Sequence, residues 1–196
     1  MRFFYMQDDS LLHHRFVPNA NGRYKTLEFD TDYKLNALGL RDHEYSLQKP
    51  PNTFRILMLG DSFTEGDGVM SHETFSKVLE ARLRKLPTTM RFEVINAGVP
   101  SYSSMLEYLY LKHYGLQLNP DVVMIHFDLS DIYDDIEYAK SARFDENGNP
   151  VDATIKCEDV ELKKEVGIAK TDPVTGEYFI ALPTGRYYAY YADVKG

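Results

Sequence analysis

The chain has 196 residues, of which 43% are hydrophobic and 27% are charged, and its formal net charge at pH 7 is -8. This composition is typical of a soluble globular protein with one domain or slightly more. The acidic balance argues against nucleic acid or an anionic membrane surface as the main partner, because phosphate groups are bound by clustered Lys and Arg.

Cysteine usage and hydropathy add little about location. The single cysteine, Cys157, cannot form an intrachain disulfide, so it neither requires nor excludes an oxidising compartment. No apolar stretch approaches the ~20 residues that span a bilayer, and the first ten residues lack the apolar segment of a secretory signal. The compartment is not determined, and the default expectation is a cytoplasmic protein unless the N-terminus is truncated. The oligomeric state is not indicated.

Composition predicts three regions along the chain. Residues 1–53 are rich in Asn, Asp, Gly and Pro and predict an irregular arm. Residues 54–136 alternate between strand and helix patterns, which predicts a parallel α/β core with right-handed crossovers. The expected strands are residues 54–59, 92–95 and 121–127, and the expected helices are about 71–86 and 103–114.

Two details of this core can be checked directly. The first helix should begin at Ser71 and bury an apolar stripe formed by Phe75, Val78, Leu79, Leu83 and Leu86. The strand at 121–127 is almost continuously apolar, so we expect both of its faces to be covered.

The remaining residues, 137–196, predict a β-hairpin insertion or lid. Gly-containing turns indicate hairpins at 143–151 and 170–180, with a short helix at about 156–166 and a Tyr-rich strand at 187–191. Such a segment can select a substrate, or it can be a plain pair of surface hairpins.

Ser62 is the candidate nucleophile. It follows the apolar strand 54–59 within the sequence Gly60-Asp61-Ser62, and open α/β sheets place their chemistry beyond the carboxyl ends of such strands. The glycines do not form a phosphate loop, because Asp67 and Gly68 stand where Lys and Ser/Thr are needed. The lipase elbow G-x-S-x-G is not matched either. In the simplest alternative, Ser62 is a turn or helix-capping residue.

All three strands end in residues suited to one site: 60–62, then 96–98, then 128–131. Together these blocks resemble the SGNH, or GDSL-like, ester hydrolase family over residues 50–135. Gly60-Asp61-Ser62 matches the first block in full, Gly98 matches the glycine of the second, and residues 128–131 align with the third, usually Gly-x-Asn-Asp. The resemblance implies a flavodoxin-like, doubly wound parallel sheet, of which three strands would be an incomplete set.

The resemblance also implies roles for individual residues. Ser62 would attack an ester carbonyl to give an acyl-enzyme, and the backbone N–H groups of Ser62 and Gly98 would bind the oxyanion. Ser130 stands where the family has its asparagine, so a shorter hydroxyl would have to serve as the third oxyanion donor.

The family's final block, Asp-x-x-His, is absent. Its absence predicts a truncated domain whose base lies on a missing part. Within the chain, His126 at the end of the third strand is the candidate surrogate base, and a structural histidine is the alternative.

We expect neither a cofactor nor a metal site. The acidic residues near the third strand favour a solvated cluster at a helix start over a Mg²⁺ or Ca²⁺ site; they are Asp128, Asp131, Asp134 and Asp135.

Three functions remain open. The first is a serine ester hydrolase that acts on small acyl esters, such as O-acetyl groups of a glycan. The second is an inactive SGNH-like module that binds carbohydrate or a protein. The third is a flavodoxin-like domain that binds a phosphate ligand, which Asp61, Glu65 and Asp67 oppose.

Overall fold

The computed structural model describes residues 5–153, 170–171 and 178–179. Contacts divide the chain into one unit spanning residues 2–155 and a second formed by Met1 and residues 156–196. In the second unit, β10 (Lys170–Thr171) pairs antiparallel with β11 (Tyr178–Phe179), which confirms the hairpin expected there. The helix expected at 156–166 and the strand at 187–191 lie outside the described residues.

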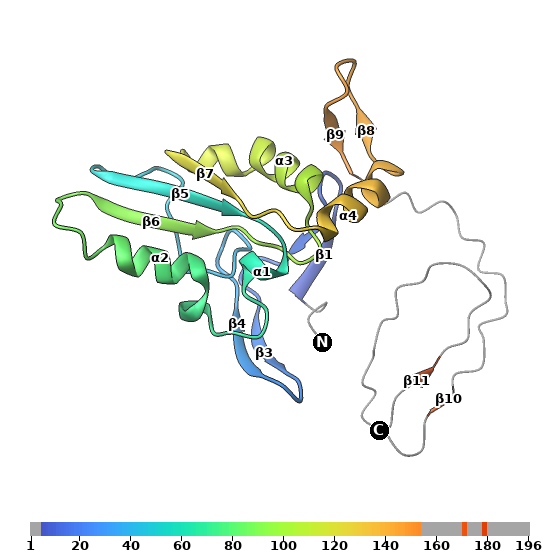
Figure 1. Ribbon diagram of the computed structural model, residues 1–196, viewed down its shortest axis with the longest axis horizontal. Coiled ribbons are helices and arrows are strands. Elements are labelled where there is room, and N and C mark those ends of the chain that lie inside the picture. Colours follow the sequence, from blue (N-terminus) through green and yellow to red (C-terminus); the bar gives the residue numbers. More distant parts are fainter. Residues whose placement is uncertain (1–4, 154–169, 172–177, 180–196) are drawn as a thin grey trace. The chain divides into compact units, whose positions relative to one another are not determined.

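Three parallel strands form the centre of the first unit, in the order β6–β5–β7 (Figure 1). They are β5 (Thr53–Leu59), β6 (Arg91–Asn96) and β7 (Val122–Ile125). Leu57 at the middle of β5 is paired with Ile95 on one side and Val123 on the other. The prediction of a mixed α/β core is therefore confirmed.

Side-chain alternation along β5 divides the apolar core between two helices. Ile56 and Met58 pack with Leu79 and Leu83 of α2 (Phe75–Leu83). Leu57 and Leu59 belong to the larger cluster, which also contains Leu106 and Leu109 of α3 (Ser104–His113). A 3₁₀ turn, η3 (Gly115–Leu118), follows α3.

The expected helix at 71–86 is split. A 3₁₀ turn, η2 (Ser71–Glu73), precedes α2, and the side chain of Thr74, not Ser71, accepts the capping hydrogen bond from the Lys77 N–H. Thr74 has extended backbone angles, which interrupt the helix between the two pieces.

The N-terminal arm differs from the expected irregular segment. It contains two antiparallel hairpins, β1 (Met6–Asp9) with β2 (His13–Phe16) and β3 (Asn21–Lys25) with β4 (Asp30–Lys34). Apolar side chains of this arm are buried in the same cluster as those of β5 and α3; they are Leu12, Phe16, Tyr33, Leu35 and Leu40. The arm is thus part of the hydrophobic core.

The expectation that both faces of the third strand are covered is wrong for the described residues. β7 lies at the edge of the sheet, and Met124 and Ile125 are exposed. The helix that follows, α4 (Ser130–Ala139), also exposes apolar side chains, including Ile132 and Ile136. An apolar run cannot show whether a neighbouring element covers it.

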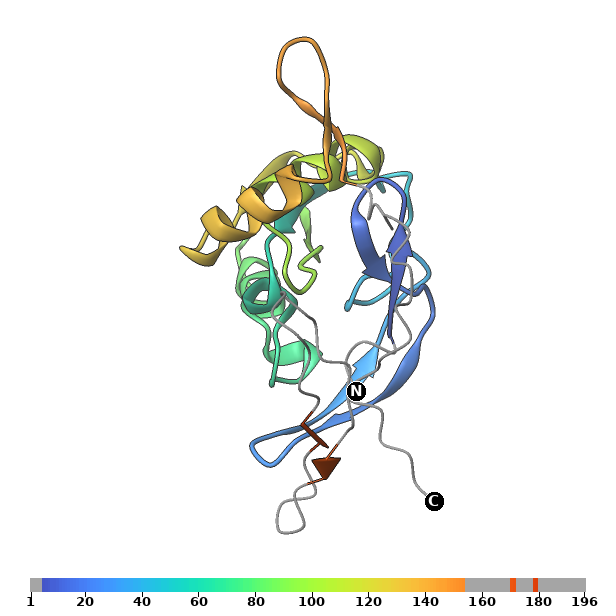
Figure 2. The same cartoon turned by 90° about the vertical axis from the view of Figure 1, so that its right-hand side faces the viewer.

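The hairpin expected at 143–151 is confirmed. Strands β8 (Arg143–Phe144) and β9 (Pro150–Asp152) pair antiparallel after α4. Both views show their turn standing out from the rest of the unit (Figures 1 and 2).

Candidate active site

Ser62 is the first residue of a one-turn helix, α1 (Ser62–Glu65), which begins two residues after β5 ends. The Asp61 side chain caps the turn by accepting a hydrogen bond from the Phe63 N–H at 2.8 Å. The Ser62 side chain is partly exposed, and no described group hydrogen bonds to its hydroxyl or to its backbone N–H. Both groups are therefore available to a ligand.

The turn before Ser62 requires glycine. Gly60 has φ +157°, and a Cβ there would lie 2.0 Å from Thr64 Oγ1 and 3.2 Å from the Cβ of His126. This close approach brings the end of β7 against the start of α1.

A buried ion pair holds α1 in place. The Glu65 side chain is 0% exposed and lies 3.1 Å from Arg41, which is 1% exposed. Arg41 also donates to the carbonyls of Gly66 at 2.5 Å and Val69 at 2.6 Å, and Tyr33 donates its hydroxyl to Glu65. The N-terminal arm thereby fixes the helix that carries Ser62.

Gly98 lies directly on α1. A Cβ at this position would be 2.2 Å from the backbone nitrogen of Glu65, so a side chain cannot be accommodated without movement. The Gly98 N–H donates to Asn96 Oδ1 at 3.1 Å. To act as an oxyanion donor, Gly98 would have to share this N–H or release it from Asn96.

Ser130 begins α4, and its hydroxyl donates to Asp128 Oδ1 at 2.5 Å. Its backbone N–H donates to the same oxygen at 2.6 Å. These bonds make Ser130 part of the turn between β7 and α4, and its hydroxyl is engaged within the chain.

His126 lies just beyond β7, at the same edge of the sheet as Ser62. Its backbone N–H donates to the Leu59 carbonyl at 3.0 Å, and its exposed ring lies 6.2 Å from the Phe63 ring and 5.9 Å from the Phe75 ring, measured between centroids. No hydrogen bond joins His126 to Ser62. The candidate base His126 and the candidate nucleophile Ser62 thus lie at the same edge of the sheet but do not hydrogen bond to each other.

One of the four acids predicted to form a solvated cluster, Asp131, is buried, and the other three are half-buried. Carboxylate oxygens of Asp61, Asp128 and Asp131 all lie within 4.8 Å of one another, and Asp61 and Asp131 are 6% and 1% exposed. Burial, with the neighbouring Asp128 charge in addition, raises the pKa of both. Hydrogen bonds from Ser130 lower the pKa of Asp128. The prediction of a solvated cluster is therefore wrong for Asp131.

Two other histidines, in the arm, are half-buried. Burial, followed by the adjacent His14, lowers the pKa of His13 to about 4, and Asp8 opposes this shift. Burial also lowers the pKa of His14, whose Nε2 lies 2.8 Å from the Pro100 carbonyl. Both are structural residues of β2.

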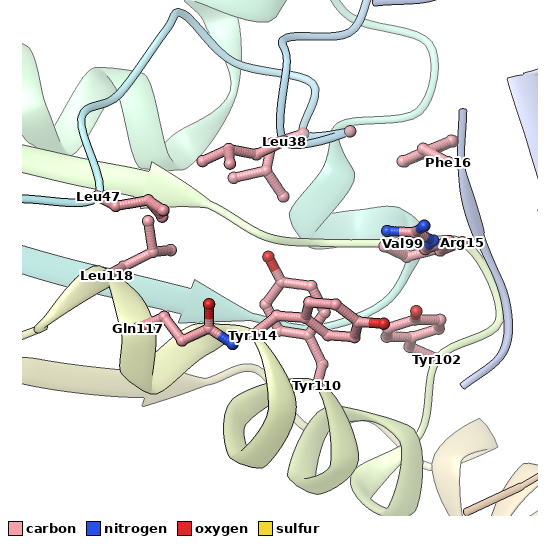
Figure 3. Close-up of a pocket in the computed structure, with 12 residues that line it drawn as sticks. Arg15, Phe16, Leu38, Leu47, Val99, Tyr102, Tyr110, Tyr114, Gln117 and Leu118 are labelled. Carbon is pink, nitrogen blue, oxygen red and sulfur yellow. The ribbon is translucent and has the colours of Figure 1, made fainter. Parts of the chain in front are cut away.

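A partly enclosed hollow elsewhere on the unit is not lined by Ser62. It has a volume of about 110 Å³ and lies between the arm and the C-terminal part of α3. Figure 3 shows Tyr110 and Tyr114 extending into it, with Leu38 and Leu47 on one side and Arg15 on another. A second, more open hollow of about 420 Å³ is lined mainly by residues with polar or charged side chains, including Asp42, His72 and Lys77.

Sequence reasoning did not find Arg41 or Glu107 as residues near the site. Glu107 lies on α3. No local signal marks either residue, because each reaches the site through tertiary packing.

Comparison with known proteins does not assign a family: no family model matches the chain, and no curated protein is significantly similar to it. Among the described helices, none combines the length and the apolar character needed to cross a bilayer.

Proposed function

We propose that this chain is a serine ester hydrolase of the SGNH type, built on a flavodoxin-like, doubly wound sheet. One observation carries the proposal: Ser62 starts a helix at the carboxyl end of the central parallel strand, with its hydroxyl and its backbone N–H both free of partners in the described residues. Parallel α/β sheets place ligands and nucleophiles at this position.

In the proposed reaction, the Ser62 hydroxyl attacks the ester carbonyl and gives its proton to a base. The tetrahedral oxyanion accepts a hydrogen bond from the Ser62 N–H. Its collapse expels the alcohol, which takes up the proton, and water then hydrolyses the acyl-enzyme.

His126 is the candidate base within the chain. Its exposed ring makes no hydrogen bond to described residues, so rotation about its side-chain bonds costs no existing partner. Contacts with Phe63 and Phe75 keep the ring beside α1.

Substrates of this proposed enzyme are small acyl esters, with O-acetyl groups of a glycan as the leading class. This choice follows from the resemblance to SGNH hydrolases.

A catalytically inactive SGNH-like module that binds carbohydrate or protein is the second candidate. Two observations favour it: the Gly98 N–H is bonded to Asn96, and the Ser130 hydroxyl is bonded to Asp128. An oxyanion site that lacks one donor typically loses about 10²–10³-fold in turnover.

Hydrolysis of p-nitrophenyl acetate by the 196-residue chain separates these candidates. We expect turnover that is lost in Ser62→Ala and retained in Ser71→Ala, a matched serine on η2. His126→Asn should lose turnover as well. Equal rates in the wild type and Ser62→Ala would contradict the hydrolase and favour the binding module.

A further inference from the structure

The acids beside Ser62 come from three segments that converge on one point. Asp61 lies between β5 and α1, Asp128 lies between β7 and α4, and Asp131 lies in the first turn of α4. Their nearest carboxylate oxygens are all within 4.8 Å of one another. Two oxygens on opposite sides of one Ca²⁺ are about 5 Å apart, so this spacing fits ligands of a single hard cation.

The described residues provide no cation to balance these charges. No Lys or Arg of the described part of the chain forms an ion pair with Asp61, Asp128 or Asp131. The charged or titratable groups that act on them are other acids and His126. Acid side chains packed this closely repel one another unless they share protons or bind a cation.

A fourth carboxylate supplies an independent observation. Glu107 is 1% exposed, and neither of its carboxylate oxygens has a hydrogen-bond partner. Burial, and then the charges of Asp131, Asp61 and Asp135, raise the pKa of Glu107 to about 8, so its carboxyl group on α3 lies close enough to interact with the acids of the cluster. An ionised carboxylate that is buried without a partner is strongly unfavourable.

The packing of α3 against α4 keeps Glu107 in this position. The Met105 N–H, in the first turn of α3, donates to Asp135 Oδ1 at 2.9 Å. The two helices are thereby joined at the end where the acids meet.

We infer that Asp61, Asp128 and Asp131 form a binding site for one hard divalent cation, Ca²⁺ or Mg²⁺, with the buried Glu107 carboxylate as a fourth acidic group facing it. Oxygen ligands alone, without His or Cys, suit these two metals. The cation would stabilise the junction of α1, α3 and α4, and Asp61 would link it directly to the backbone of Ser62. The site does not depend on the proposed hydrolase activity.

Metal titration of the 196-residue chain tests this inference. After EDTA treatment and dialysis, CaCl₂ or MgCl₂ is added in separate calorimetric titrations and thermal melts, with KCl at matched ionic strength as the control. We expect one site per chain and, at about 100-fold above the Kd, a Tm increase of roughly 5–10 °C. KCl should produce no comparable increase.

Variants distinguish a cation bound by these specific residues from cations attracted nonspecifically to a negatively charged surface. Asp131→Asn and Glu107→Gln should each weaken binding by at least about tenfold, because each removes a charge that faces the metal. Asp128→Asn, at a half-buried position, provides the same test if Asp131→Asn does not fold. Asp134→Asn, on the same helix but outside the three ligands, should change the affinity by less than about threefold.

Two results would overturn the inference. One is the absence of binding heat and of a Tm increase at millimolar Ca²⁺ and Mg²⁺ in a chain that is folded by circular dichroism, which would mean that the acids share protons instead. The other is an equal loss of affinity in Asp134→Asn and Asp131→Asn. Neither result bears on ester hydrolysis, which the Ser62→Ala comparison measures separately.

Discussion

The buried pair between Arg41 and Glu65 gives the sharpest stability prediction. Replacing Arg41 with Met keeps a long apolar side chain but removes the cationic partner of the fully buried Glu65 carboxylate, which still accepts a hydrogen bond from the Tyr33 hydroxyl. Removing one partner of a buried ion pair costs about 3–5 kcal/mol. The carbonyls of Gly66 and Val69 also lose their donor. We therefore expect the loss of stability in Arg41→Met to lie in the upper part of this range.

Urea unfolding followed by far-UV circular dichroism measures this change. Arg23→Met is the matched control, because Arg23 pairs with Asp30 on the exposed surface of the same arm, and it should have little effect. The double variant Arg41→Met/Glu65→Gln should be more stable than Arg41→Met alone, since the uncompensated charge is removed. If Arg41→Met is no less stable than Arg23→Met, the arm does not hold α1 as we argue.

Three other predictions follow from local geometry. Gly98→Ala should lower the free energy of unfolding by about 1–3 kcal/mol, measured in urea, because the new Cβ would meet backbone atoms of α1; an unchanged midpoint would show that α1 moves freely. The pKa of His13 is near 4 in the folded protein, below the ordinary value of 6.5. Between pH 4 and pH 6.5 the folded protein therefore binds fewer protons than the unfolded chain. The free energy of unfolding should therefore fall as pH decreases from 6.5 to 4, and the double variant His13→Asn/His14→Asn should show a smaller fall; an equal fall would exclude these histidines as its source. Ile132→Lys and Ile136→Lys, on the exposed face of α4, should each change stability by less than about 0.5 kcal/mol and reduce binding of the dye ANS; a large destabilisation would mean that this face is covered.

The parallel core could be predicted because its strands are short apolar runs between helical patterns. The same reasoning located Ser62, since the carboxyl ends of parallel strands meet at one edge of the sheet. These signals are local, so a single sequence contains them.

Tertiary interactions account for what the sequence did not reveal. The apolar spacing of α2 predicts buried Phe75 and Val78, yet both are exposed and Glu80 is buried. Glu80 accepts a hydrogen bond from the Val94 N–H of β6 at 2.8 Å and pairs with Lys77 of its own helix, so these two partners offset the cost of burying its charge. The spacing of apolar residues along a helix does not indicate such hydrogen-bond and ion-pair partners.

The acidic cluster illustrates the same limit at the site. The spacing of Asp128 and Asp131 is typical of an exposed helix start, and the sequence does not show that α3 covers it. Glu107 lies more than twenty residues earlier in the chain, and only the packing of α3 on α4 brings it to these acids.

Covalent labelling of Ser62 tests the central claim most directly. The 196-residue chain is incubated with a fluorophosphonate, and the modified peptide is identified by mass spectrometry, with Ser62→Ala and Ser71→Ala as controls. We predict one adduct per chain, located on Ser62, absent from Ser62→Ala and present in Ser71→Ala. A folded chain that is not labelled, or is labelled equally in Ser62→Ala, would contradict the assignment of Ser62 as an activated nucleophile.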